Sequence, residues 1–391
     1  MSLSSRLIEV AKGADALLGR PLAAAFQGPQ RALPSDPDDV LIIRLWGLGN
    51  LALMAPQFAA NRQRRLRLMT LQRNVPFVRT YLPGVELLVV PDPLSPRLPW
   101  VVAQIANQLT RDRPQVIVDC EQFLRLPLIL ARWASGAPCV GLDTPGQGRG
   151  PLLDEPLAYE PLRHGAETFA ALWARAGLAT SDAPGGLHSS PERHQAQRRN
   201  WGLDERPLVI LHPGSGDHFP GRRWPAERFG ELMSVLATEG SCQLLITGSA
   251  DERQLCARAA KAAMSTTTTA ITDLSGQLTI EALIDLLTGA ALLVTNDTGP
   301  LHLADALGTP TVGLFGPNTP HRYGPRRAGS VALHADLPCS PCLDDRHMKH
   351  SSCRHYACMT SLAVDDVAGA CRAILSTSAL QPAAGAHAHS S

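Results

Sequence analysis

The polar turn Thr295-Asn296-Asp297-Thr298-Gly299-Pro300 carries the clearest chemistry in this sequence. An apolar run typical of a buried strand, residues 290–294, precedes the turn, and a short helix is predicted after it, over 301–307. A helix that begins near Thr298 or Gly299 presents free backbone N–H groups and the positive end of its dipole. Both features suit a phosphate.

Two side chains could take part in such a site. Asp297 lies in the turn, and His302 lies one helical turn further on, on roughly the same side. The alternative is that Asp297 only caps the helix and that His302 is a surface residue. A second apolar run over 311–315 completes a strand, turn, helix, strand unit, which is half of a parallel α/β fold. Ligands of such folds bind at the carboxyl ends of the strands.

Similar polar turns follow strands in the first half of the chain. The apolar run 40–45 leads into Gly47-Leu48-Gly49-Asn50, a Gly-x-Gly turn that lacks the third glycine of a dinucleotide-binding motif. The run 115–118 ends in Asp119-Cys120-Glu121, where a carboxylate could deprotonate a hydroxyl group. The alternative for Asp119 is a helix cap. The stretch 143–162 is predicted to be a long binding loop, in which Arg149, with His164 just beyond it, could face an anionic ligand.

Four cysteines in the last quarter of the chain have a spacing that suits metal. Cys339, Cys342, Cys353 and Cys358 form a C-x2-C-x10-C-x4-C set. Four thiolates at such spacing can hold zinc or iron in a tetrahedral site. The alternative is a loop with four reduced thiols.

The motifs of the second half together resemble glycosyltransferase family 9, the ADP-heptose:lipopolysaccharide heptosyltransferases. The resemblance is carried by Asp297-Thr298-Gly299-Pro300-Leu301-His302-Leu303-Ala304, by Gly308-Thr309-Pro310, and by Leu314-Phe315-Gly316-Pro317. It implies that Asp297, Thr298, Gly299 and His302 hold the diphosphate and sugar of a nucleotide-sugar donor.

Two further segments of the second half are similar to this family. His212-Pro213-Gly214 is followed by Arg222-Arg223-Trp224-Pro225, and Arg223 stands where the family has a Lys that contacts donor phosphate. Arg keeps the charge and can bind phosphate through two nitrogens. Glu252 stands near a Glu that contacts the nucleoside in the family, although an acid in the first turn of a helix is the simpler interpretation.

The first half departs from the family at the residue where catalysis is expected. The resemblance implies a catalytic Asp in the Gly-x-Gly turn, and this chain has Asn50 there. Asn cannot accept a proton as a general base. Glu121 is therefore the candidate for a substitute base. The other interpretations are weak catalysis, or a turn that only binds the acceptor.

The resemblance implies a GT-B arrangement, in which two Rossmann-like α/β domains face each other across a cleft. The expected divisions are an N-terminal helix and linker (1–38), an acceptor-binding domain (39–185), a nucleotide-sugar-binding domain with the cysteine set (186–376), and a disordered tail (377–391). The implied reaction is inverting transfer of heptose from ADP-heptose to the lipopolysaccharide core. It requires no cofactor, because the helix N-terminus and Arg223 meet the charge of the leaving group.

Composition limits the partners and the location. The 391 residues are 45% hydrophobic, and 36 Lys and Arg balance 35 Asp and Glu, so there is no electrostatic case for nucleic acid. No run has transmembrane length and no signal peptide is visible, so the expectation is a cytoplasmic protein. The resemblance adds a glycolipid acceptor at the inner membrane face, where the protein could lie peripherally. Apolar residues at helical spacing over 3–25 indicate either a helix on the membrane surface or one packed on its own domain.

Two other functions stay open at this point. The cysteine set is similar to an iron-holding segment in the protein-modifying branch of the family, the autotransporter heptosyltransferases, and so suggests a protein acceptor. Asn50 suggests a homologue that binds a sugar nucleotide without transferring the sugar.

Overall fold

The structure is a computed structural model that describes residues 10, 12–26, 30–216, 219–264, 271–343 and 351–379. Two of the sequence predictions fall partly outside these residues: the start of the N-terminal helix and most of the C-terminal tail.

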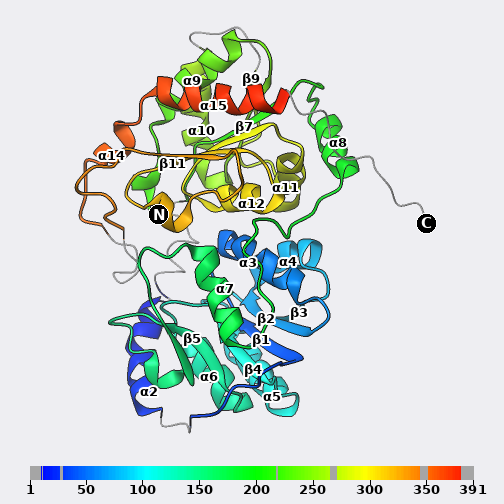
Figure 1. The fold of residues 1–391 in the computed structure, drawn as a ribbon, viewed down its shortest axis with the longest axis vertical. Coiled ribbons are helices and arrows are strands. Elements are labelled where there is room, and N and C mark those ends of the chain that lie inside the picture. The colour runs from blue at the N-terminus through cyan, green and yellow to red at the C-terminus, as the bar shows by residue number, and fades with distance from the viewer. Residues whose placement is uncertain are drawn as a thin grey trace.

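Two six-stranded parallel sheets, one in each half of the chain, form the two domains (Figure 1). The strand order is β3-β2-β1-β4-β5-β6 in the first sheet and β12-β11-β10-β7-β8-β9 in the second. Counted from the first strand of each half, both sheets follow the order 3-2-1-4-5-6 of a dinucleotide-binding Rossmann fold. The predicted GT-B arrangement of two Rossmann-like domains is thereby confirmed.

Helices cover both faces of the first sheet. One face packs on α3, α4 and α7, and the other on α5, α6 and the N-terminal helical segment. The elements of this half are β1 Asp39–Ile43, β2 Arg65–Leu71, β3 Glu86–Val90, β4 Val116–Asp119, β5 Cys139–Asp143, β6 Glu155–Ala158, η1 Asp15–Gly19, α2 Arg20–Ala25, α3 Leu48–Ala60, η2 Gln72–Asn74, α4 Val75–Tyr81, α5 Leu98–Arg111, α6 Leu126–Ser135, η3 Gly150–Leu152 and α7 Gly165–Arg175.

The second sheet is covered by α9, α10 and α15 on one face and by α11 and α12 on the other. The elements of this half are β7 Leu208–His212, β8 Gln243–Ile246, β9 Ile271–Asp273, β10 Leu292–Asn296, β11 Thr311–Phe315, β12 Val331–His334, α8 Pro191–Asn200, η4 Pro220–Arg222, α9 Ala226–Thr238, η5 Ala250–Glu252, α10 Arg253–Met264, α11 Ile280–Thr288, α12 Gly299–Leu307, α13 Pro320–Tyr323, α14 Ala357–Thr360 and α15 Val364–Ala379.

Besides the four apolar runs described above, the sequence predicts strands over 66–71, 85–90, 137–142, 207–211 and 243–247, where β2, β3, β5, β7 and β8 are observed. The strands that the sequence did not predict are β6, β9 and β12. Each is three or four residues long and forms an outer edge of its sheet. Edge strands bury only part of their side chains, so their apolar runs are short, and β6 even contains Pro156, which sheets tolerate at edges. The prediction of one long loop over 143–162 was wrong for this reason, since that stretch contains η3 and β6.

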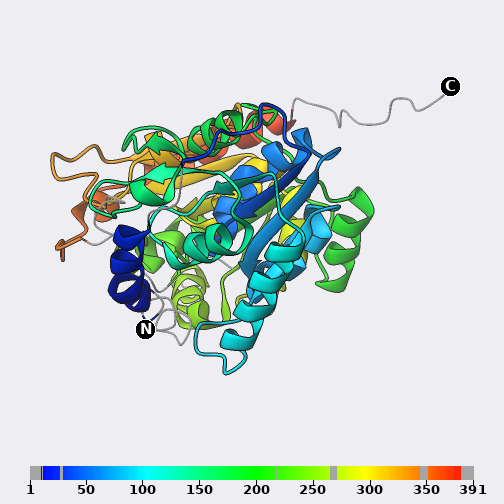
Figure 2. The same cartoon turned by 90° about the horizontal axis from the view of Figure 1, so that it is seen from below.

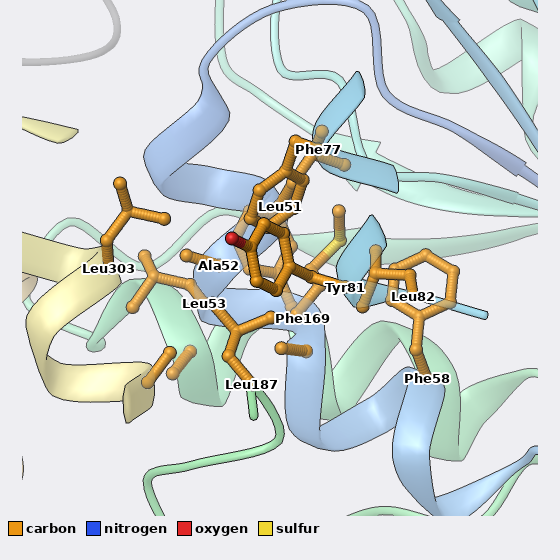
Figure 3. Packing of buried hydrophobic residues seen from close by; sticks show 14 of the residues in the cluster. Leu51, Ala52, Leu53, Phe58, Phe77, Tyr81, Leu82, Phe169, Leu187 and Leu303 are labelled. Atoms are coloured by element: carbon orange, nitrogen blue, oxygen red, sulfur yellow. The ribbon is translucent and has the colours of Figure 1, made fainter. Parts of the chain in front are cut away.

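The two domains share one apolar core where they meet. Leu53 of α3, Tyr81 of α4 and Leu303 of α12 belong to the same buried cluster (Figure 3). Beside it, the hydroxyl of Tyr81 donates to Oδ1 of Asp285 on α11 at 3.3 Å, and Arg193 pairs with that carboxylate at 3.0 Å. Apolar burial and a partly buried polar network therefore hold the domains in this relative position.

The described part of the N-terminal helix packs on the first domain, at one side of the molecule (Figure 2). The carboxylate of Asp15 is buried against the guanidinium of Arg125, with Oδ2 and Nη1 2.6 Å apart, and it also accepts the N–H of Leu126 at 2.8 Å. Of the two interpretations drawn from the sequence, the helix packed on its own domain is the one observed over residues 12–25. Leu17 and Leu18 nevertheless remain exposed.

Candidate functional site

The helix α12 begins as the phosphate-site prediction requires. Its N-cap residue is Thr298, which is extended (φ −156°, ψ 173°) and makes no side-chain capping hydrogen bond. Gly299 and Pro300 form the first turn, so the leading N–H groups of the helix are not taken by a capping side chain. These groups face the space at the carboxyl end of β10, where an anion would be stabilised by the helix dipole.

Asp297 does not cap this helix, so that interpretation of the sequence was wrong. Its Oδ2 accepts a hydrogen bond from Nδ2 of Asn318 at 2.8 Å and lies 3.5 Å from Nη1 of Arg222. The side chain is buried. Asp297 therefore ties the loop after β11 to the loop that carries the two arginines.

Asn296, which the sequence analysis did not single out, fixes the loop after β7. Its Nδ2 donates to the carbonyl oxygens of Pro213 (2.8 Å) and Gly214 (3.2 Å). Its Oδ1 accepts the N–H of Trp224 at 2.9 Å. The amide of a buried Asn at the end of a strand can donate to and accept from the backbone groups of two neighbouring loops at once. The position of Asn296 directly before Asp297 was the sequence signal that could have indicated this role.

Two arginines border the loop after β7. Nη2 of Arg222 donates to the carbonyl oxygen of Ser215 at 2.8 Å, and Nη2 of Arg223 donates to that of Gly216 at 3.1 Å. Both side chains are partly buried. Arg223 was predicted as a phosphate ligand, whereas Arg222 was not, although it is the one that contacts Asp297. Arg222 thereby places positive charge beside Asp297, next to the N-terminus of α12.

Glu252 is buried and shapes the same region from the β8 side. Its Oε1 accepts the N–H of Gly216 (2.8 Å), and its Oε2 accepts the N–H and hydroxyl of Ser249 (2.9 and 3.0 Å) in a capping box. Burial raises the pKa of Glu252, but the nearby His212 and these donors outweigh it, so the pKa is lowered. Burial lowers the pKa of His212, which keeps that ring neutral at pH 7. His212 and the backbone and hydroxyl donors together favour the charged form of this carboxylate.

Asn50 lies on the other domain, in the first turn of α3. Its N–H donates to the carbonyl oxygen of Gly47 at 2.9 Å, and its side chain is half-buried. Before it, Arg44 donates from Nε to the carbonyl oxygen of Trp46 (2.8 Å) and from Nη1 to that of Cys120 (2.5 Å). The turn that carries Asn50 is thus held to the end of β4.

Glu121 is the anchor of that turn. Its Oε1 accepts the N–H groups of Leu45 (2.6 Å) and Trp46 (3.2 Å), and its Oε2 lies 3.6 Å from Nη1 of Arg44. The side chain is buried. One carboxylate oxygen is therefore occupied by backbone donors and the other faces a guanidinium, an arrangement that positions the loop.

The two halves of the site meet where α3 touches α12. A Cβ atom on Gly49 would lie 2.7 Å from Cδ2 of His302 and 3.2 Å from Cα of Gly299. Only glycine permits this close approach of the two helices. Asn50, the residue after Gly49, therefore lies next to the N-terminus of α12. The ring of His302 also packs against Tyr323 with centroids 5.9 Å apart. His302 is therefore a buried interdomain residue, and its interpretation as a surface residue was wrong.

Arg149 and His164 do not face a ligand, contrary to the prediction. Arg149 is fully buried, where it pairs with Asp119 and donates to the carbonyl oxygen of Leu124 at 2.7 Å. His164 is the N-cap of α7, and its Nε2 lies 3.0 Å from the carbonyl oxygen of Gly324 in the other domain. Both residues stabilise the fold, and a single sequence does not distinguish such buried charges from exposed ones.

Comparisons with known proteins agree with this geometry. The family profile described as glycosyltransferase family 9 (heptosyltransferase) matches residues 122–351. The chain belongs to glycosyltransferase family 9. Lipopolysaccharide heptosyltransferase 1 of Pseudomonas aeruginosa is 30% identical over 241 residues, which are 58% of this chain and 61% of that enzyme. The chain thus matches about three fifths of the length of that relative.

Solved structures are similar in fold to this chain over most of its length. The E. coli ADP-heptose LPS heptosyltransferase II superposes with a TM-score of 0.67 at 18% identity, over 87% of this chain and 99% of that one. The iron-containing dodecameric glycosyltransferase TibC of enterotoxigenic E. coli superposes with a TM-score of 0.55 at 13% identity, over 88% and 77% of the two chains. At these identities the likeness shows the fold alone.

The cysteine set of this family 9 protein is gathered in one region. Cys342 lies where its N–H donates to the carbonyl oxygen of Pro317 (2.9 Å), and Cys358 packs near Gly316. Burial raises the pKa of Cys358, and the thiols of Cys342, Cys353 and Cys339 raise it further. Among the described residues, however, no three His, Cys, Asp or Glu side chains stand close enough to hold a metal ion. Four cysteine thiols are ligands of a type that suits zinc or iron. In their observed positions, however, they do not form a coordination site.

Within the described residues no helix is both long and apolar enough to cross a membrane.

Proposed function

We propose that this protein transfers a heptose from ADP-heptose to the lipopolysaccharide core, with inversion at the anomeric carbon. The observation that carries the proposal is the contact of α3 with α12, in a chain that belongs to family 9. It brings the turn of Asn50 next to a helix N-terminus beside which Arg222 pairs with Asp297. The names of the relatives, a lipopolysaccharide heptosyltransferase and an ADP-heptose LPS heptosyltransferase, support this donor and acceptor.

In the proposed reaction, a hydroxyl oxygen of the acceptor attacks the anomeric carbon of the donor. A new C–O bond forms, the bond to the diphosphate oxygen breaks with its electron pair, ADP leaves, and the proton of the hydroxyl passes to solvent water. Arg223 and the N–H groups at Thr298 and Gly299 stabilise the charge that develops on the leaving diphosphate. Glu252 and Asp297 shape the loops around the donor, and His302 closes the site between the domains. No metal takes part in this step.

We assign Asn50 and Glu121 to the acceptor side of the site. The amide of Asn50 can donate to or accept from the attacking hydroxyl but cannot remove its proton. Glu121 remains the carboxylate proposed to assist catalysis, and its contacts with Leu45 and Trp46 support action through the position of the loop. The protein would work in the cytoplasm, peripherally at the inner membrane face, where the glycolipid acceptor is exposed.

A transfer assay with a panel of nucleotide sugars tests the proposal. Product masses report which sugar is moved, and parallel acceptors, a lipopolysaccharide core glycolipid and an autotransporter protein, separate a lipid acceptor from a protein acceptor. Transfer of heptose from ADP-heptose to the glycolipid is expected. A protein that binds ADP-heptose but transfers nothing to either acceptor would instead be a sugar-nucleotide-binding homologue, the function that Asn50 in place of Asp favours.

Substitution of Gly299 by Ala is expected to weaken ADP-heptose binding at least about tenfold without loss of stability. A Cβ at this position meets no atom closer than the backbone nitrogen of Gly49, at 3.9 Å, so the methyl group fits the protein and intrudes only on a ligand. Titration calorimetry with ADP-heptose measures the effect. Gly369→Ala, in α15 with nothing within 4 Å, is the matched control. Equal affinities of the two variants would contradict the placement of the diphosphate at α12.

We also propose that Cys339, Cys342, Cys353 and Cys358 bind one structural zinc or iron ion when the metal is supplied. The similarity of fold to the iron-containing TibC and the four clustered thiols support this assignment. Elemental analysis of protein purified without chelator is expected to give about one metal ion per chain. Cys339→Ser should lower that content and the melting temperature, whereas Cys242→Ser, a thiol outside the set, should leave the metal content unchanged. Metal-free protein of full stability would refute the assignment.

A further inference from the structure

A cavity of about 490 Å³ lies at the carboxyl edge of the first sheet, on the face that α5 and α6 cover. Leu45, Leu71 and Val90, which lie in or just after β1, β2 and β3, line one side. Val102 of α5 and Leu130 of α6 line the other. Its volume falls within the range of small-molecule sites, about 300–1,000 Å³. The described contacts of the donor site do not include these residues.

The walls of this cavity suit hydrocarbon. Asp15 is the one charged side chain among the described residues that line it. Both oxygens of its carboxylate are already used by the side chain and N–H of Arg125 and by the N–H of Leu126. The remaining lining is aliphatic, aromatic and proline. A sugar or a phosphate would therefore lose its hydration there without compensation, whereas apolar surface would gain from burial.

The cavity is elongated and open at an apolar rim. Its lining follows α6 from Leu126 to Trp133, which is about 10 Å at the rise of an α-helix. Trp133 is 76% exposed, and Val10 on the N-terminal helical segment is 49% exposed. Figure 2, seen from the end of the first domain, shows this N-terminal helix at the edge of the molecule. A narrow, flexible chain fits such a channel better than a compact ring.

One wall of the cavity is formed by the loop that leads to the acceptor side of the site. Trp46, in its wall, belongs to the loop that Glu121 holds and that leads to Asn50.

From these observations we propose that the cavity binds a fatty acyl chain of the glycolipid acceptor. The inference rests on the proposed function, because that function supplies an acylated acceptor. The chain enters between α5 and α6, the head of the chain lies beside Trp46, and the sugar part of the same molecule extends past the loop 44–47 toward Asn50. The cavity would thereby select an acylated acceptor and orient its sugar toward the donor.

Binding of intact and deacylated acceptor, measured separately from transfer, tests this inference. The full-length protein is expected to bind the acylated core glycolipid at least tenfold more tightly than the same glycan without its chains, since each methylene group buried is worth roughly fourfold in affinity. A brominated fatty acid, used alone, should quench the tryptophan fluorescence through Trp46 and Trp133. This second readout needs neither donor nor turnover, so it can succeed even if the proposed transfer reaction fails.

Variants that fill the cavity should remove the preference for the acylated acceptor. Val102→Phe places a ring in the cavity from α5, and Leu130→Phe places one from α6. Two variants are used so that the test stands even if one of them folds poorly. Ala103→Phe, at an exposed neighbouring position of α5, is the matched control and should retain the preference. Binding of the deacylated glycan and of ADP-heptose should stay within about threefold of the unmodified protein in every variant.

Three results would overturn the inference. Equal affinity for the acylated and deacylated acceptors would leave the cavity without a role in acceptor binding. Equally tight binding of phosphatidylethanolamine vesicles, abolished by Val102→Phe, would identify bulk membrane lipid as the occupant. Fatty-acid quenching that arises only after removal of residues 1–9 would show that the chain fills the cavity with its own N-terminus.

Discussion

Asn50→Asp is expected to raise the turnover number for heptose transfer by roughly a hundred- to ten-thousand-fold, the usual worth of a general base. Asn50 lies in the first turn of α3, and the residue before it touches His302 and Gly299 of the donor helix. The family pattern places an Asp at this position. A carboxylate there would accept the proton of the attacking hydroxyl, which the amide cannot do.

The pH profile distinguishes this effect from a change in packing. With Asp in place, kcat/KM should acquire an ascending limb at the pKa of the new carboxyl group, and the unmodified protein should lack that limb. Asn107→Asp adds the same charge at an exposed position of α5 and should leave both the rate and the profile unchanged. An Asn50→Asp protein that turns over no faster would indicate that a base already operates elsewhere in the site.

Glu121→Gln completes that experiment. Because Glu121 accepts two backbone N–H groups and faces Arg44, its loss is expected to lower the free energy of unfolding by roughly 1–3 kcal/mol and to raise the KM for the acceptor. A base would act differently, since its removal would lower turnover by two or more orders of magnitude at unchanged stability. The two roles therefore separate in a melting curve and a KM-against-kcat comparison.

The central strands and their polar turns could be predicted from the sequence because the physics there is local. Strands β1, β7, β10 and β11 are short, almost wholly buried and mainly apolar, and each leads into a turn that contains Gly, Asn or Asp. The edge strands β6, β9 and β12 escaped prediction because their pairing depends on a neighbour distant in the chain rather than on their own pattern.

The roles of individual charged residues depended on contacts that one sequence cannot display. Arg149 resembles a ligand-binding residue in a glycine-rich stretch, yet it is fully buried against Asp119. Asp297 resembles a helix cap, yet it joins Asn318 to Arg222. In each case the partner lies 21 to 75 residues away in the chain. The donor motif was recognisable by similarity to the family. The contacts that each of its side chains makes became known only from the structure.

Arg223→Gln is expected to lower kcat by roughly a hundred- to a thousand-fold, the cost of removing one donor that stabilises developing negative charge. The guanidinium lies beside the loop after β7, where Nη2 donates to the carbonyl oxygen of Gly216 at 3.1 Å. Gln can still donate to that oxygen, so the substitution mainly removes charge. Single-turnover kinetics with saturating ADP-heptose measure the chemical step separately from product release.

Two companion variants make the interpretation of Arg223 specific. Arg223→Lys keeps the charge but loses the planar fork, so it should recover much of the rate while binding donor less tightly. Arg258→Gln, a half-exposed surface arginine paired with Glu227 at 3.5 Å, should behave like the unmodified protein. Should Arg223→Gln instead retain kcat within about threefold, the charge on the leaving diphosphate must be met by Arg222 and the N-terminus of α12. Arg222→Gln would then be the substitution that lowers kcat, together with stability, because that side chain also holds the carbonyl oxygen of Ser215 and the carboxylate of Asp297.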